Sequence, residues 1–299
     1  MHLIRTLGPP VLALLAVLLI DRSSRRRGLL PPRFRVAPTA TRDQVIMAWI
    51  RRLAAMAVLV LILWVGVFAA LGVVGSGTGV DPSQVSRIDL FLLHAMLVFC
   101  LMVWYAAGFL PREAGRPEGR TDWRTQLGFE TRSIGREIGI GLVFGALAWL
   151  VVLGALMTAA FILWWWGGEA LLPQEPPPLI PWIAALPLAL RLAISLSAGV
   201  VEETFFRGFL QPRAGLVVST ALFVLAHASY EQPLMLIGIG LLSLIYGGLV
   251  YWRQSIWSAI AAHTLFDAVQ LTVVIPAALK LIPRETVPSD VARWVFGLV

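Results

Sequence analysis

Six residues in the last third of the chain carry acidic, basic or imidazole side chains inside otherwise apolar segments. Ionisable groups at membrane depth are costly, so each of them requires a physical reason. Within the pairs Glu203/Arg207 and His263/Asp267 the members are four residues apart, which places both on one face of a helix. The full set is Glu202, Glu203, Arg207, His227, His263 and Asp267.

Glu202 and Glu203 are adjacent and would point in different directions from a helix. Successive side chains differ by about 100° around the helix axis. One carboxylate can therefore face a site while the other pairs with Arg207 on its own face.

The depth of these residues in their apolar segments indicates whether they can meet. Counting about 1.5 Å per residue from the basic ends of the segments places Glu203 roughly 15 Å deep, His227 roughly 20 Å deep and His263 roughly 15 Å deep. In a hydrocarbon core about 30 Å thick these levels nearly coincide. We therefore expect three helices to bring carboxylates and imidazoles to one layer near the midplane.

Two kinds of chemistry suit such a set, and the residues alone do not separate them. A carboxylate can take a proton from water, with a histidine sharing or relaying it. Alternatively, zinc or another divalent metal could be bound by two imidazoles and two carboxylates, with water in the open position, as in a metalloprotease. The metal ligands would be Glu202, His227, His263 and Asp267.

Structural interpretations compete with these functional ones. Glu202 and Glu203 could form salt bridges near a helix end, and a single buried histidine is by default a hydrogen-bonded core residue. The joint occurrence of acids and imidazoles at one depth favours a functional site. His94 has no acidic neighbour along its own segment, and we predict a structural role for it.

The composition places the chain in the membrane class. Hydrophobic residues make up 58% of its 299 residues, charged residues only 14%, and the mean hydropathy is +0.81. The net charge of +7 comes almost wholly from arginines beside apolar segments. This pattern indicates membrane orientation and contact with anionic lipid headgroups rather than nucleic-acid binding. The single cysteine, Cys100, excludes a disulfide or a cysteine-based metal site within the chain.

The apolar runs are continuous rather than alternating, which excludes a β-barrel and predicts an all-α, polytopic bundle of seven to eight transmembrane helices. The first run is interrupted early by Pro9 and Pro10 and predicts a short membrane anchor. The predicted spans are Leu7–Ile20, Leu53–Val74, Ile88–Leu110, Ile138–Trp166, Arg191–Arg213, Ala214–Ser229, Leu234–Trp252 and Ile256–Leu279.

The loops predict orientation and organisation. Arginines gather in alternate loops, so these loops are expected to face the cytoplasm, and the Arg-, Ala- and Pro-rich composition indicates a bacterial inner membrane. We expect three regions. Residues 1–137 hold the anchor, the basic loops and two further spans, residues 138–279 hold the catalytic bundle, and residues 280–299 form a short interfacial tail.

Three motifs resemble those of the CPBP intramembrane protease family, which includes CAAX prenyl endopeptidases and Abi-type bacteriocin-processing or self-immunity proteins. They are Glu202-Glu203-x-x-x-Arg207, Phe223-x-x-x-His227 and His263-x-x-x-Asp267, and the resemblance covers roughly residues 138–279.

The resemblance implies a helical bundle with a cavity open to the cytoplasm or to lipid. It also implies that Glu202 and His227 activate water for peptide hydrolysis while His263, with Asp267, stabilises the oxyanion. In much of the family the last position is Asn. An ionised Asp267 would repel an oxyanion, so it would have to be protonated, orient His263 or bind metal.

We therefore predict an intramembrane endopeptidase that cleaves a membrane-associated peptide or protein. The composition indicates a bacterium, where we expect the substrate to carry no prenyl group, and the sequence does not indicate an oligomeric state. A non-catalytic immunity or scaffold protein of the same fold is the first alternative. A proton-coupled transporter is the second, but the inverted repeats that would favour it are not visible.

Overall fold

The computed structural model describes residues 2–26, 39–68, 86, 88–106, 123–172, 179–230 and 232–280. Every regular element in these ranges is a helix, which confirms the all-α class. A helix satisfies its own backbone hydrogen bonds, as a lipid environment requires. The principal helices are α1 (His2–Arg26), α2 (Arg42–Leu63), α4 (Asp89–Ala106), α6 (Ile134–Gly167), α8 (Leu188–Glu203), α10 (Leu216–Ala226), α11 (Pro233–Arg253) and α12 (Trp257–Val269).

Shorter elements connect or extend these helices. Three of them are π-helical, and two of these directly continue the helices that carry site residues. The short elements are η2 (Trp64–Phe68), α5 (Trp123–Gln126), η4 (Gly168–Leu171), α7 (Leu179–Ala184), η5 (Thr204–Leu210), α9 (Gln211–Ala214), η6 (Ala228–Tyr230), η7 (Gln270–Val274) and α13 (Ile275–Leu279).

Four helical stretches in the described ranges are long and apolar enough to cross a membrane: Arg42–Phe68, Ile134–Leu171, Pro233–Arg253 and Trp257–Leu279. α4 and α10 form shorter apolar helices. The predicted seven to eight spans are therefore not shown. One reason is chemical, since the continuous helical stretch of α8, η5 and α9 is interspersed with the ionisable side chains that the sequence singles out.

The first two helices differ from the expected pattern. α1 runs without a break through Pro9 and Pro10, where an interruption was expected, and prolines are tolerated in this way within membrane helices. α2 begins well before the predicted Leu53, because Thr41 and Gln44 form a capping box. The cap, rather than the first apolar residue, determines where this helix begins.

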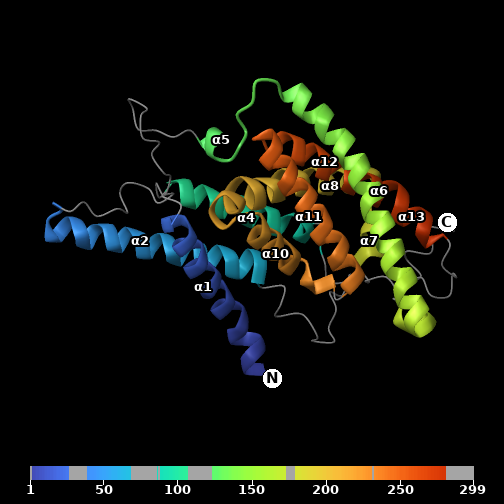
Figure 1. Ribbon diagram of the computed structural model, residues 1–299, viewed down its shortest axis with the longest axis horizontal. Coiled ribbons are helices and arrows are strands. Elements are labelled where there is room, and N and C mark those ends of the chain that lie inside the picture. Colours follow the sequence, from blue (N-terminus) through green and yellow to red (C-terminus); the bar gives the residue numbers. More distant parts are fainter. Residues whose placement is uncertain are drawn as a thin grey trace.

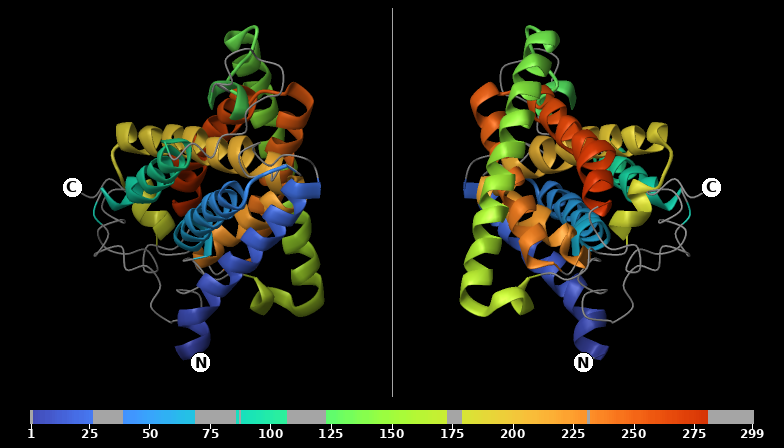
Figure 2. Two further views of the ribbon diagram at one scale, coloured as in Figure 1. Left: turned by 90° about the vertical axis from the view of Figure 1, so that its left-hand side faces the viewer. Right: turned by 90° about the vertical axis from the view of Figure 1, so that its right-hand side faces the viewer.

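α12 lies at the centre of the packing and contacts both α6 and α8. Figure 1 shows α6 as a long helix beside α11 and α12, and both views of Figure 2 place it along one flank of the bundle. Gly145 of α6 allows the close approach, since a Cβ atom there would lie 2.8 Å from the carbonyl oxygen of Ala262. Small residues at such a contact let two helix backbones pack directly.

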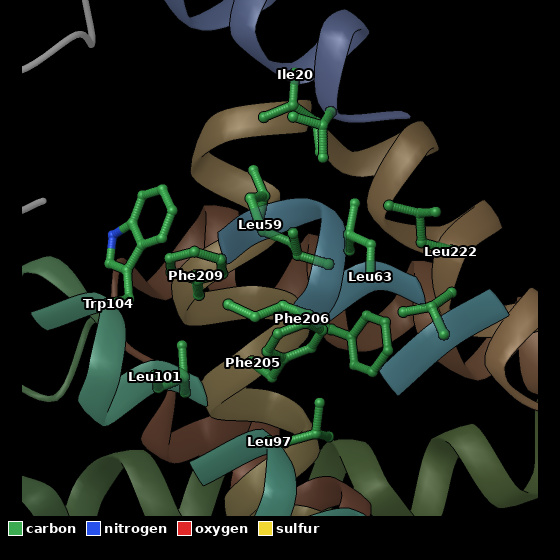
Figure 3. Packing of buried hydrophobic residues seen from close by; sticks show 14 of the residues in the cluster. Ile20, Leu59, Leu63, Leu97, Leu101, Trp104, Phe205, Phe206, Phe209 and Leu222 are labelled. Atoms are coloured by element: carbon green, nitrogen blue, oxygen red, sulfur yellow. The ribbon is translucent and has the colours of Figure 1, made fainter. Parts of the chain in front are cut away.

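The largest hydrophobic cluster joins the N-terminal helices to the segment that carries the acidic pair. Phe205, Phe206 and Phe209 of η5 are fully buried against side chains of α2 and α4 (Figure 3). The Phe205 and Phe206 rings meet edge to face with centroids 5.0 Å apart. The other labelled members in Figure 3 are Ile20, Leu59, Leu63, Leu97, Leu101, Trp104 and Leu222. The N-terminal helices thus help to hold η5 in place.

Residues 281–299 of the predicted interfacial tail and much of the predicted Arg-rich loops lie outside the described residues.

Candidate active site

The six predicted residues come from three helical segments. Glu202 and Glu203 end α8, where Arg207 follows in η5, while His227 caps α10 and both His263 and Asp267 lie in α12. The structure places a carboxylate of α8 within 4.0 Å of an imidazole from each of the other two segments. The three segments therefore meet, and their common depth in a membrane stays a prediction.

Glu203 is completely buried and lies between two cationic or imidazole partners. Its Oε1 atom is 3.0 Å from Arg207 Nη1 and 2.8 Å from His263 Nδ1. Breaking a buried pair of this kind leaves an uncompensated charge, so the contact ties η5 to α12. As predicted, one of the two adjacent acids pairs with Arg207, and it is Glu203.

Aromatic rings enclose the Arg207 guanidinium. Its Cζ atom lies 4.3 Å from the centroid of the Phe223 ring and 5.7 Å from that of Tyr246. Nη2 also donates to the carbonyl oxygen of Ser243 at 3.4 Å. These contacts make Arg207 a structural link between η5, α10 and α11.

Glu202 faces a different set of groups. Its Oε1 atom lies 3.3 Å from His94 Nε2, and its Oε2 atom lies 4.0 Å from His227 Nε2. Oε2 is buried and has no hydrogen-bond partner among the residues that the structure describes. A buried carboxylate oxygen with spare acceptor capacity beside an imidazole is suited to receive a proton.

The tautomer of neutral His227 follows from its neighbours. Nδ1 is 2.8 Å from the carbonyl oxygen of Phe223, and because a carbonyl can only accept, Nδ1–H donates. The Nε2 lone pair therefore faces Glu202. The ring packs between Phe223 and Tyr230, with centroid distances of 4.7 and 5.9 Å. Its side chain is 21% exposed.

His263 has a carboxylate near each ring nitrogen. Nδ1 contacts Glu203, and Nε2 lies 3.4 Å from Asp267 Oδ2. The ring stacks on Tyr246 at a centroid distance of 5.3 Å. The Asp267 side chain is 27% exposed, whereas that of His263 is 8% exposed.

His94 has an acidic partner in the structure, although the structural role predicted for it stays a prediction. No acidic residue adjoins it along α4, but the fold brings Glu202 to it from α8, and the two side chains are both buried. Its other ring nitrogen, Nδ1, lies 2.8 Å from Ser197 Oγ. The sequence feature that could have indicated this contact is the histidine itself, because an imidazole inside an apolar helix requires a hydrogen-bond partner.

The side chains do not form a metal site in their present arrangement. No group of three or more His, Cys, Asp and Glu side chains in the described ranges could hold a metal ion. Both nitrogens of His263 already face carboxylates, so the ring has no free lone pair directed at a shared centre. In this arrangement the residues do not fit a divalent metal ion, and we derive no reaction step through a metal.

The buried acid–imidazole site lies within a region of the chain that resembles a known family. Residues 184–269 match the model of the family described as type II CAAX prenyl endopeptidase Rce1-like. The three motifs lie within this matched region, which confirms their resemblance to the family. With its four candidate spans, it is an integral membrane protein.

The matched region runs from the end of α7 to the end of α12 and includes all six predicted site residues. His94 lies outside it. No curated protein and no solved structure matches the chain.

Proposed function

We propose that the protein is an intramembrane endopeptidase in which Glu202 and His227 activate a water molecule. The observation that supports this most directly is the buried, unpartnered Glu202 Oε2 facing His227 Nε2 at 4.0 Å. Membership of residues 184–269 in a protease family adds the reaction class. The substrate is a membrane-associated peptide or protein, and we propose that it carries no prenyl group.

The separation of Glu202 and His227 suits a bridging water. At 4.0 Å the two acceptor atoms are too far apart for a direct hydrogen bond. A water that donates one hydrogen to each, at about 2.8 Å, spans a gap of this size. Both of its hydrogens are then directed at bases, and an oxygen lone pair is free to attack a carbonyl carbon.

The reaction balances with these two residues. The water oxygen forms a bond to the scissile carbonyl carbon as Glu202 takes one water proton, and the carbonyl oxygen becomes an oxyanion. The C–N bond then breaks, and the proton held by Glu202 passes to the leaving amine nitrogen, directly or through His227. The hydroxyl proton of the new acid is lost to solvent, and the enzyme returns to its starting state.

We assign stabilisation of the oxyanion to His263 Nε2–H, as the family resemblance implies. Glu203 fixes the ring from the Nδ1 side at 2.8 Å, whereas the contact with Asp267 on the Nε2 side is longer at 3.4 Å. The longer contact is the one that a substrate oxygen can replace. Asp267 in this proposal orients the ring before the substrate binds, and its negative charge balances that of the ring.

The finer features of the membrane arrangement are also proposals. The alternation of arginine-rich and arginine-poor loops in the sequence supports seven to eight spans with the basic loops in the cytoplasm of a bacterial cell. Labelling of single cysteines placed in successive loops, from each side of the membrane, tests this topology directly.

The experiment that tests the reaction is proteolysis of a mixed peptide library by the purified protein in detergent, with the metal content measured on the same sample. The proposal predicts cleavage that is unaffected by a chelator such as EDTA. Stoichiometric zinc with chelator-sensitive cleavage would instead support the metal ligands predicted from sequence. Absence of any cleavage by the wild type would support the non-catalytic immunity or scaffold role.

A further inference from the structure

We infer that His94 of α4, a residue outside the family domain, is the positioning residue that fixes the carboxylate of Glu202 for proton transfer. This inference rests on the proposed function and adds a group to its site. It also gives the N-terminal half of the chain a part in the reaction.

Three side chains in a row carry the inference. Ser197 Oγ lies 2.8 Å from His94 Nδ1, and His94 Nε2 lies 3.3 Å from Glu202 Oε1. Ser197 and Glu202 both belong to α8, whereas His94 reaches them from α4, which packs against α8. The imidazole therefore bridges two positions of one helix from a second helix.

The direction of these hydrogen bonds follows from which atoms can donate a hydrogen and which can only accept one. A carboxylate oxygen only accepts, so Nε2–H of His94 donates to Glu202. In a neutral ring Nδ1 then accepts from the Ser197 hydroxyl, and in a charged ring it donates to the same oxygen. Ser197 can take either part because a hydroxyl is both donor and acceptor. The bond to Glu202 is the same in both cases.

The two carboxylate oxygens of Glu202 therefore have different roles. Oε1 is held by His94, while Oε2 faces His227 and has no hydrogen-bond partner among the described residues. Without the donor at Oε1 the carboxylate could rotate about its last side-chain torsion. Oε2 would then no longer point toward the bridging water. Groups that fix a reacting atom in this way are worth about 100-fold in rate.

Packing around α4 makes the arrangement rigid. Leu97 and Leu101, about one and two turns beyond His94, are buried in the cluster that also holds η5 (Figure 3). The helix that carries the imidazole and the segment that follows Glu202 are thereby fixed to one another. The family domain of residues 184–269 lacks this donor when taken alone.

The test compares full-length variants in the peptide cleavage assay. His94→Leu removes the donor, and we expect kcat to fall about 100-fold with KM nearly unchanged. His94→Gln retains an N–H near the place of Nε2 and should restore most of kcat. Ser197→Ala should give an intermediate loss. Phe99→Leu, at an exposed position on the same helix, is the matched control and should behave as wild type.

A second readout does not depend on activity. Thermal midpoints in detergent of His94→Leu, Glu202→Gln and the double variant form a cycle, and we expect non-additive shifts because the two side chains are in contact. Additive shifts would overturn the inference, and so would wild-type kcat in His94→Leu, even while the proposed function stands.

Two further outcomes have separate meanings. A wild type that cleaves nothing overturns the proposed function itself. Covalent labelling of Ser197 by a fluorophosphonate, with complete loss of activity in Ser197→Ala, would overturn the positioning role and make Ser197 the nucleophile of a Ser–His–Glu arrangement.

Discussion

Glu202 and Glu203 are neighbours in the chain, yet their carboxylates belong to separate networks. Glu203 is enclosed by Arg207 and His263, with contacts of 3.0 and 2.8 Å. Each acid keeps one buried oxygen without a hydrogen-bond partner in the described part of the chain, and that of Glu202 lies 4.0 Å from His227 Nε2. The angle between successive helical positions separates them, so one acid can stabilise the fold while the other is left available for chemistry.

The first prediction concerns stability. Arg207→Ala leaves the Glu203 charge without its cationic partner in a fully buried setting, and we expect a loss of about 3–5 kcal/mol in the free energy of unfolding. The thermal midpoint and the folded yield in detergent should both fall. The matched control is Arg253→Ala, whose 2.6 Å pair with Glu137 is 17% exposed on the arginine side and should cost less. An unchanged midpoint for Arg207→Ala would contradict the structural role.

The second prediction concerns Tyr246, whose hydroxyl oxygen is buried and makes no hydrogen bond within the described ranges. Tyr246→Phe keeps the ring that stacks on His263 and removes only that oxygen. Because a buried polar group without a partner is unfavourable, we expect the thermal midpoint to stay the same or rise. A clear fall in midpoint would show that the hydroxyl has a partner, and a loss of kcat alone would indicate a role toward the substrate.

The third prediction concerns the contact between α6 and α12. A Cβ atom at Gly141 would collide with the carbonyl oxygen of Ser258, whereas one at Gly139 meets nothing within 4 Å. Gly141→Ala should therefore separate the two helices and reduce both stability and activity, since α12 carries His263. Gly139→Ala, on the same helix, should be neutral or slightly stabilising. Equal effects of the two substitutions on midpoint and kcat would argue against this packing.

The fourth prediction concerns His227. His227→Ala removes one of the two bases that share the bridging water, and we expect kcat to fall by about 10²–10⁴-fold. Its side chain is partly exposed, so the loss of midpoint should be small. Activity near that of the wild type in the purified variant would remove His227 from the reaction.

Much of the helical architecture could be predicted because long apolar runs leave few alternatives in lipid. The segments around α4, α6, α11 and α12 appear close to where the sequence predicts them. What could not be predicted is how several helices are modified locally. The π-helical turn of η5 has no signal in the apolar pattern, and the early start of α2 depends on a cap at Thr41 rather than on hydrophobicity.

The candidate site was predictable to the extent that it depends on helical spacing and depth. The pairs Glu203/Arg207 and His263/Asp267 follow from one helical turn, and the common level of three helices follows from counting residues. The contact between His94 and Glu202 joins residues that are 108 positions apart. Such a pairing arises only when α4 docks against α8, and nothing adjacent to His94 in the sequence indicates it.

The most direct test of the proposed reaction is to compare wild type and Glu202→Gln at equal amounts of folded protein in the peptide cleavage assay. Glutamine keeps the size of the side chain and an oxygen that can face His94 but cannot act as a base at neutral pH. We predict cleavage by the wild type and a loss of about 10²–10⁴-fold or more in the variant, with intact folding. Cleavage by both at similar rates would show that Glu202 is not the base and would contradict the proposed mechanism.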